Sequence, residues 1–421
     1  MERNKYYDII VIGAGAGGLF FGAACSDFKR VLILEKTKKA GTKLLMSGSG
    51  QCNVTHGGSI KEFLSCYGQN GKKIRSCLYK HNNIELCRFL SELGVESYER
   101  EDGKIFPLSM EAEEVRSALL AACAKNGVEI RYGSAVTEIE AVPTDRLRYR
   151  VRTGSGEVFA CRHLVVAAGG ASYPTTGSDS SLLKILTRDL PELAVVPLRP
   201  ALVPVFVEGY PFSELSGIGF RNVQIKIYPN AKFTGSPLDL PNPVGDLLLT
   251  HKNLSGPVIL NNSRYMQNGF GLEINFVFPY NDIDMLSQLK ADFSQNRRIL
   301  SAYIAEKYTL PKKFTAAVLK LADLSDKPAA QLSGKEINRI CNAFTKMRFS
   351  ASGTAGYKQA MATAGGISLD DINTAEMQSK KYPGLYFIGE VSDIDGDTGG
   401  YNLQFAYSSA RAVIDSISKA F

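Results

Sequence analysis

A glycine-rich turn between an apolar strand and a helix constrains this chain more than any other feature. Residues 7–12 form the short apolar run that is typical of a buried parallel strand. Gly13-x-Gly15-x-x-Gly18 follows at once and opens a predicted helix from Gly17 to Phe28. In this spacing the first glycine makes a tight turn, the second lets the backbone approach a pyrophosphate, and the third allows close helix–strand packing. The motif predicts a βαβ unit of the Rossmann type that binds a dinucleotide.

An acidic residue at the end of the next strand supports this prediction. Val31–Leu34 is apolar, and Glu35 follows it about twenty residues after the glycines, where a carboxylate accepts hydrogen bonds from ribose hydroxyls. A carboxylate there would also repel a 2′-phosphate. The alternative is a tight glycine turn in an ordinary α/β unit, and the position of Glu35 makes that alternative the less favoured one.

The composition is that of a soluble globular protein and excludes several other classes. The chain has 421 residues, of which 44% are hydrophobic and 22% charged, with a net charge of +7. These values exclude a disordered, collagen-like or coiled-coil protein and favour two or three domains. Eight cysteines without a C-x-x-C pair and only four histidines argue against disulfides and zinc. No stretch reaches the ~20 apolar residues of a membrane helix, so we expect a cytoplasmic protein with no membrane contact.

The pattern of the chain changes after Pro191 and changes back near its end. Alternating apolar residues such as Val223, Ile225 and Ile227 predict half-buried antiparallel strands in a β-barrel or sandwich. A strand-free, charged stretch from Asp282 to Met347 has helical spacing. The last part returns to an apolar strand and a closing helix. The chain therefore predicts one α/β domain that is split by an inserted β module and a helical module.

Three further segments place glycines or acids at predicted strand ends. Residues 41–55 contain Ser47, Gly48 and Gly50, and residues 163–174 run from a strand into Ala168, Gly169 and Gly170. Residues 384–405 are the most specific, with Gly389, Glu390, Asp393, Gly400, Asn402 and Leu403 between a strand and the last helix. Taken singly, the first two are equally well explained as a polar loop and a strand followed by a turn.

The third segment suits a flavin better than a metal. An acid at its strand end can bind a ribityl hydroxyl, and the N-terminus of the last helix can stabilise an anionic reduced flavin. Asp393, Asp395 and Asp397 alternate as in a calcium loop, but Thr398 and Gln404 stand where such a loop needs Gly and Glu. We therefore predict no metal site.

Together these segments resemble the BaiN-like (YhiN-type) family of FAD-dependent oxidoreductases over nearly the whole chain. The likeness includes GAGAGG at 13–18, GTKLLMSGSGQCNVT at 41–55, AAGGASYPTTG at 167–177, GDLLLTHKNLSGP at 245–257, ASGTAGYKQAMATAGGI at 351–367 and GLYFIGEVSDIDGDTGGYNLQFAYSSA at 384–410. The family implies a Rossmann-like FAD-binding domain split by an inserted β-barrel-like module and a small helical module. We place the FAD-binding domain at 1–190 and 350–421, the barrel-like module at 191–281 and the helical module at 282–349.

The resemblance also implies which residues hold FAD. The predicted FAD-binding residues are Gly13, Gly15, Gly18, Glu35, Lys36, Lys43, Ser47, Gly48, Gly50, Cys52, Asn53, Val136, Ala168, Gly169, Gly170, Gly389, Glu390, Asp393, Gly400, Asn402 and Leu403. Two departures from the family pattern concern the substrate more than FAD. Gln51 stands where the family usually has Arg, and Ser-Asp-Ser-Ser at 178–181 replaces a glycine-containing turn.

Four functional hypotheses follow. The favoured one is a reductase that transfers hydride from flavin N5 to an electron-poor C=C bond of a small-molecule or pyrimidine-base acceptor. Because no second G-x-G-x-x-G is present, NAD(P)H would be a transient donor. The second hypothesis is reduction of uridine in ribosomal RNA to dihydrouridine, permitted by basic runs at 72–75 and 312–313. The others are a small-amine oxidase that makes peroxide and a flavin-binding protein without turnover. The oligomeric state stays open.

Reduction of a C=C bond also needs a proton donor. The candidates are Cys52, in the loop most expected to face the flavin, and His251, before a Leu-Ser-Gly-Pro turn of the insert. For each, the alternative of a packing or loop-stabilising role carries more weight from the sequence alone.

Overall fold

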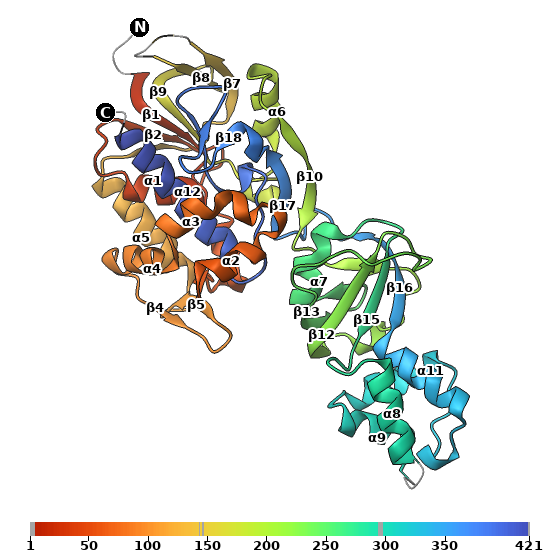
Figure 1. Ribbon diagram of the computed structural model, residues 1–421. Helices are drawn as coiled ribbons and strands as arrows, with labels where there is room; N and C mark the ends of the chain where they lie inside the picture. The colour runs from red at the N-terminus through yellow and green to blue at the C-terminus, as the bar shows by residue number, and fades with distance from the viewer. Residues whose placement is uncertain (1–4, 143, 145–146, 294–297, 420–421) are drawn as a thin grey trace. The chain divides into compact units, whose positions relative to one another are not determined.

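The computed structural model describes residues 5–142, 144, 147–293 and 298–419, and the chain divides into two compact units (Figure 1). The first, here called the α/β unit, comprises Met1–Ala201 and Tyr357–Phe421; the second, the inserted unit, comprises Leu202–Gly356. The chain thus leaves the α/β unit once, builds a barrel with helices, and returns. This arrangement confirms the predicted fold class, an α/β domain interrupted by a β-barrel and helices.

Within the described residues, a nine-stranded sheet forms the centre of the α/β unit. Its parallel part runs in the order β20-β9-β1-β2-β6; β8 pairs antiparallel with β9, and β7 pairs antiparallel with β8. The strands are β1 (Tyr6–Ile12), β2 (Val31–Leu34), β6 (Glu129–Arg131), β7 (Val136–Ala141), β8 (Tyr149–Thr153), β9 (Val158–Val166), β18 (Ile372–Asn373), β19 (Gln378–Ser379) and β20 (Leu385–Phe387). Because β1 lies between β2 and β9, its residues Ile9–Val11 are completely buried, which explains the continuous apolar run.

Helices from both ends of the chain pack together beside this sheet. Helix α1 (Ala16–Ala24) contacts α5 (Ala112–Lys125) and the C-terminal α12 (Tyr401–Ser418). The rings of Phe20 in α1 and Tyr407 in α12 lie 5.6 Å apart. The sequence predicted that the first helix extends to Phe28, but α1 ends at Ala24. The prediction failed because Phe28 leaves the helical path to stack its ring on that of Phe21.

Smaller elements complete the α/β unit. The remaining helices are α2 (Ile60–Cys66), α3 (Arg75–Lys80), α4 (Asn83–Glu92) and α6 (Ser181–Asp189). One small antiparallel sheet joins β3 (Thr55–His56), β5 (Lys104–Pro107) and β4 (Ser97–Glu99), and a second joins β10 (Val195–Ala201) to β17 (Ala362–Ile367).

A closed six-stranded barrel forms the inserted unit's β part. Its order is β11 (Val205–Val207), β14 (Leu254–Ser255), β13 (Val244–Leu249), β12 (Gly219–Tyr228), β15 (Gly271–Asn275) and β16 (Met347–Thr354). In β12 the predicted alternation is confirmed, with Val223, Ile225 and Ile227 buried. In β15 the alternation is lost, because Glu273 is also buried by ion pairs with Arg348 (2.8 Å) and Lys226 (3.6 Å).

Helices share a core with this barrel. They are α7 (Pro257–Asn262), α8 (Asp282–Phe293), α9 (Leu300–Lys307), α10 (Lys312–Leu321) and α11 (Gly334–Thr345). The ring of Phe314 in α10 lies 4.6 Å from that of Phe220 in the barrel and 4.7 Å from that of Phe276. None of the helices in the described ranges combines the length and apolarity that a bilayer crossing requires.

A buried histidine in the central sheet gives folding a pH dependence. His163 in β9 is 1% exposed, beside Tyr386 in β20. Burial, followed by the positive charges of Arg162 and Arg148, lowers its pKa from 6.5 to about 4. Because the unfolded chain binds the proton first as the pH falls, the stability that the neutral ring contributes is present above pH 6.5 and lost towards pH 4.

We therefore expect His163→Phe to flatten the acid side of the stability profile. Between pH 6.5 and pH 4, the free energy of unfolding of the wild type should fall by about 3 kcal/mol more than that of the variant. Urea unfolding at a series of pH values measures this difference. Parallel profiles for the two proteins would contradict it.

Candidate functional site

The predicted motifs meet at one edge of the central sheet. Strands β20, β9, β1 and β2 are adjacent and parallel, so their carboxyl ends point to the same side. The glycine turn after β1, Glu35 after β2, the Gly169-Gly170 turn after β9 and Gly389 after β20 therefore lie at that edge. In open α/β sheets ligands bind outside the carboxyl ends of the strands.

The three glycines of the first motif have different surroundings. A Cβ on Gly18 would lie 2.0 Å from the Gly13 carbonyl oxygen, and one on Gly13 would lie 2.6 Å from the carbonyl oxygen of Ala167. These two glycines let the helix and β9 approach the turn. A Cβ on Gly15, in contrast, would meet nothing within 4 Å. Gly15 is also the N-cap of α1 and offers no side chain to cap it, so open space faces the positive end of the helix.

Glu35 lies beside this turn with its carboxylate directed at it. The side chain is largely buried, and its oxygens accept hydrogen bonds from the Ala14 N–H and from the N–H and hydroxyl of Thr37, each at 2.8 Å. The Glu35 carbonyl accepts from the Ser134 N–H at 2.8 Å, which brings the segment leading to Val136 alongside. Lys36 turns to Asp179 instead, at 2.6 Å.

The loop after Lys43 has an unusual backbone. Gly48, Ser49, Gly50 and Cys52 all have positive φ, and the Cys52 N–H donates to the carbonyl of Ser47 at 2.9 Å. Two of these residues carry side chains, so the conformation is held by the surrounding structure. The Cys52 side chain is completely buried, and burial raises the pKa of its thiol to about 11.

Asn53 connects this loop to the start of α12. Its amide nitrogen donates to the carbonyls of Thr55 (2.8 Å) and Ile105 (3.1 Å), and its amide oxygen accepts from the Gly400 N–H at 3.2 Å. Gly400 is the N-cap of α12 with φ of 94°, and a Cβ there would lie 2.6 Å from three backbone atoms of Thr55. The loop and the helix N-terminus are therefore fixed as one assembly.

Glu390 belongs to a charged cluster at the end of β20. Its carboxylate accepts from the Lys43 ammonium at 2.6 Å and from the Ser172 hydroxyl at 2.9 Å, and Lys43 also donates to Ser172. The cluster lies against the turn after β9, because a Cβ on Gly170 would come within 2.9 Å of a Glu390 oxygen. Gly169, preceded by the half-buried Ala168, has φ of 69° in the same turn.

The remaining predicted residues mainly organise the backbone. The N–H of Gly389 donates to Ser409 of α12 at 3.0 Å. Asp393 accepts from the Gly365 N–H (3.1 Å) and from Asn70 (3.0 Å). Asn402 bonds both backbone groups of Gly396 at 2.9 Å, and Leu403 packs half-buried against the core.

His251 is not among these residues, because it belongs to the inserted unit. It is exposed in the turn between β13 and β14.

Sequence reasoning missed a buried polar network beside the site. Gln404 is completely buried, accepts from the Thr55 hydroxyl at 2.6 Å and donates to the His81 carbonyl (3.0 Å) and the Ser408 hydroxyl (2.9 Å). Ser172 belongs to the motif at 167–177, which does not predict its contact with Glu390. In the sequence, Gln404 is a polar residue on the otherwise apolar face of the last helix. That position indicates a buried polar contact but does not identify the residues that it contacts.

These residues fit a flavin dinucleotide. The open space at the uncapped start of α1 suits a pyrophosphate, and Glu35 at the end of β2 suits a ribose. In the described part of the chain, no three His, Cys, Asp or Glu side chains are grouped so that they could hold a metal ion.

Known proteins of one family match this chain over nearly its whole length. Residues 7–415 match the model of the HI0933-like protein Rossmann domain. The chain is 32% identical to a ribosomal RNA dihydrouridine synthase of Haemophilus influenzae, over 99% of this chain and 100% of that protein. It is 28% identical to a 3-dehydro-bile acid delta(4,6)-reductase of Clostridium scindens, over 95% and 96%. Its fold is similar to that of 3-ketosteroid delta1-dehydrogenase from Sterolibacterium denitrificans, with a TM-score of 0.51, 14% identity and coverage of 99% and 100%.

Proposed function

Because this chain belongs to the HI0933-like family of FAD-dependent oxidoreductases, we propose that it reduces the C5=C6 bond of a uridine in ribosomal RNA to give dihydrouridine. The family membership confirms the resemblance to BaiN-like (YhiN-type) proteins. The reaction is one case of the predicted reduction of an electron-poor C=C bond, since the uracil double bond is conjugated to a carbonyl.

One observation carries the choice of acceptor. The dihydrouridine synthase is 32% identical, and the alignment leaves almost no part of either chain unmatched. No domain of that relative is therefore missing here, including the inserted unit. The bile acid reductase is 28% identical over a slightly smaller share of both chains, which favours uridine over a steroid-like acceptor.

The residues of the site have defined roles in this proposal. The N–H groups at the start of α1 would bind the FAD pyrophosphate in the space at Gly15, and Glu35 would accept from the ribose hydroxyls. Lys43 and Ser172 hold Glu390 in place at the end of β20. When bound, FAD supplies the hydride, and we propose NAD(P)H as its transient source.

The chain itself must supply the proton for the second carbon of the double bond. We propose Cys52 for this role, because it lies next to Asn53 in the loop that is fixed to the start of α12 and a thiol carries a proton at neutral pH. Cys52→Ala should lower turnover about 100-fold while FAD binding is retained. Unchanged turnover would move the role to another group, such as His251.

The function is tested with the purified holoprotein. Unmodified ribosomal RNA, NADPH or NADH and the enzyme are incubated without oxygen, and dihydrouridine is measured by mass spectrometry of the digested RNA. We expect dihydrouridine only when enzyme and donor are both present. Oxidation of the donor by an enone steroid, with no dihydrouridine in RNA, would instead support the small-molecule reductase.

A further inference from the structure

The positive charge of the chain is unevenly divided between its two units. The inserted unit, Leu202–Gly356, contains 17 Lys and Arg against 12 Asp and Glu, a surplus of five. The α/β unit contains 32 against 30, a surplus of two, although it is the larger unit. Most of the net charge of +7 therefore belongs to the insert.

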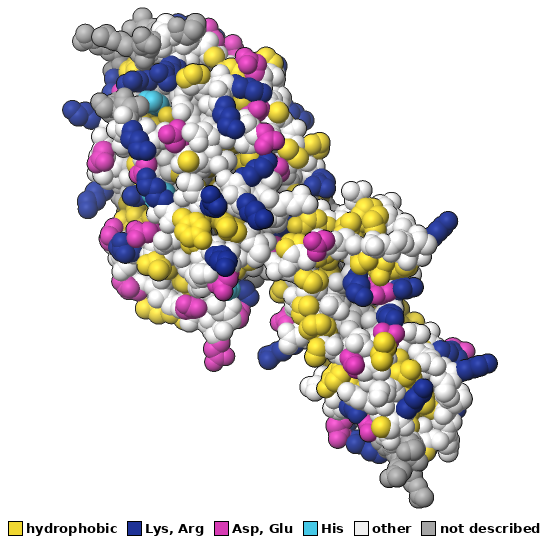
Figure 2. Space-filling model, viewed as in Figure 1, with side chains coloured by type: hydrophobic (Ala, Val, Ile, Leu, Met, Phe, Trp, Pro, Cys, Tyr) yellow, Lys and Arg dark blue, Asp and Glu magenta, His cyan; other side chains and the backbone are white. Residues whose placement is uncertain are grey.

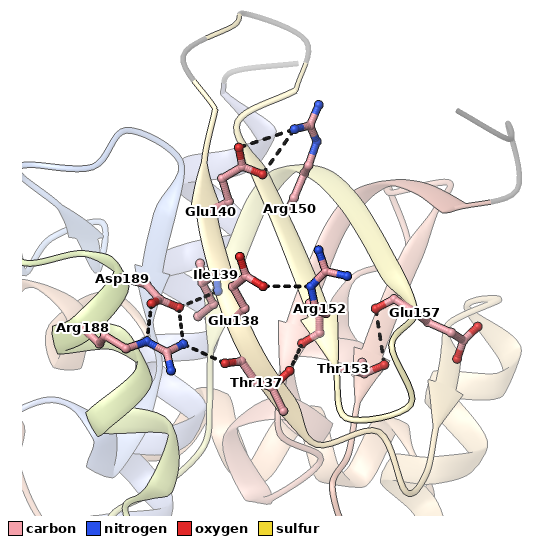
Figure 3. Close-up of polar contacts among 10 residues, drawn as sticks. All are labelled: Thr137, Glu138, Ile139, Glu140, Arg150, Arg152, Thr153, Glu157, Arg188 and Asp189. Carbon is pink, nitrogen blue, oxygen red and sulfur yellow. Dashed lines mark hydrogen bonds and ion pairs between the residues drawn. The ribbon is translucent and has the colours of Figure 1, made fainter.

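In the α/β unit, acids nearly equal bases in number, and part of the basic side chains pair with acids of the same unit. Figure 3 shows this for the β7–β8 hairpin, where Arg150 pairs with Glu140 (3.2 Å) and Arg152 with Glu138 (2.8 Å). Arg188 of α6 pairs with Asp189 next to them. On the face shown in Figure 2, blue and magenta side chains are intermingled over this unit. Such a surface offers a polyanion little net attraction.

Helix α10 of the inserted unit has one apolar face and one basic face. Phe314, Val318 and Leu319 face the core, whereas Lys312, Lys313 and Lys320 are exposed. We call these three residues the α10 lysine face. The helix contains no acidic residue. Within the described ranges, Lys313 and Lys320 form no ion pair; Lys312 lies near Glu306.

Helix stability favours Lys320, which stands in the last turn, but it does not explain Lys312 and Lys313. Lys312 and Lys313 stand in the first turn of α10, where the helix dipole disfavours positive charge. Lys313 and Lys320 are seven residues apart and so project from the same side, about 10 Å apart along the axis. A row of unpaired ammonium groups on one side of a helix is suited to an extended chain of phosphates.

We propose that the α10 lysine face binds the phosphate backbone of the ribosomal RNA substrate. This inference rests on the proposed function and adds to it a surface of the inserted unit that binds the RNA. Phosphate contacts position a nucleic acid without reading its sequence. The face would therefore set affinity, and the flavin site would select the uridine.

The test uses the full-length holoprotein with the double variant Lys313→Glu/Lys320→Glu. Its matched control is Lys125→Glu/Lys184→Glu, which reverses two exposed helical lysines of the α/β unit that form no ion pair with any described residue and changes the net charge equally. Binding of an unmodified ribosomal RNA transcript is measured by filter retention over a range of salt concentrations. The flavin spectrum and its reduction by NAD(P)H are recorded for each protein.

We expect the α10 variant to bind the transcript about 10-fold more weakly than the wild type. The slope of its log binding constant against log salt concentration should be smaller in magnitude by about two. The control should bind like the wild type. All proteins should keep the same flavin spectrum. Equal weakening of both variants, or no weakening of either, overturns the proposal. So does binding to phosphatidylglycerol vesicles that depends on the same lysines while RNA binding does not. RNA binding through α10 without any dihydrouridine would refute the proposed function and leave the binding surface standing.

Discussion

The Gly15→Asp variant is expected to fold normally and to lose FAD. The new side chain enters open space, since nothing lies within 4 Å of its Cβ, and the backbone of Gly15 is extended with φ of −76°. Aspartate is a favoured N-cap, so α1 should become more stable by a few tenths of a kcal/mol. Its carboxylate would lie where we propose that the pyrophosphate binds, and the repulsion should weaken FAD binding about 100-fold or more.

Gly15→Asn is the matched control for this variant. Asparagine has the same size and caps a helix equally well, but it carries no charge. We expect it to weaken FAD binding by roughly tenfold less than aspartate does. The measurements are FAD titration by fluorescence and thermal unfolding of the protein without flavin. An aspartate variant that holds FAD as tightly as the wild type would show that the pyrophosphate does not bind at the start of α1.

Gly400→Ala should damage both the fold and the cofactor site. The residue has φ of 94°, and the added Cβ would lie 2.6 Å from the Cα, C and O of Thr55. The backbone of Thr55 must then move, which disturbs its hydrogen bond to Gln404 and the contact of Asn53 with the Gly400 N–H. We expect a loss of about 3 kcal/mol or more in the free energy of unfolding, together with loss of flavin binding.

Gly94→Ala is the control for Gly400→Ala, because it imposes the strain of a positive φ without a close contact between the new Cβ and its neighbours. Gly94 also has positive φ, at 84°, but a Cβ there would meet nothing within 4 Å. Its substitution should cost only about 1 kcal/mol and leave FAD binding intact. Urea unfolding and flavin retention measure both effects. Equal losses in the two variants would mean that the contact between Thr55 and Gly400 does not hold the site together.

Glu390 contacts residues that its position in the sequence did not predict. An acid at the end of β20 was predicted to bind a ribityl hydroxyl, and that role stays a prediction. In the structure the carboxylate is held by Lys43 and Ser172. The charge of Lys43 is thereby largely balanced before any ligand binds, so the two residues act on the site as a pair.

The sequence alone determined the features that depend on neighbouring residues. The glycine turn, the buried strand before it and Glu35 after the next strand lie within thirty residues, and their spacing follows from the geometry of one βαβ unit. The alternation in β12 likewise reports a local period of two. These signals, with the long C-terminal motif, were enough for the fold class and the family.

Only the tertiary structure decided which distant residues meet. Lys43 and Glu390 are 347 positions apart, and Thr55 and Gln404 are 349 apart. Their contacts exist because α12 packs on α1 and returns the end of the chain to its beginning. The burial that raises the pKa of Cys52, and the exposure of unpaired lysines on α10, also depend on what packs around each side chain. A one-dimensional pattern carries periodicity and spacing, but it does not carry the surroundings that set charge and burial.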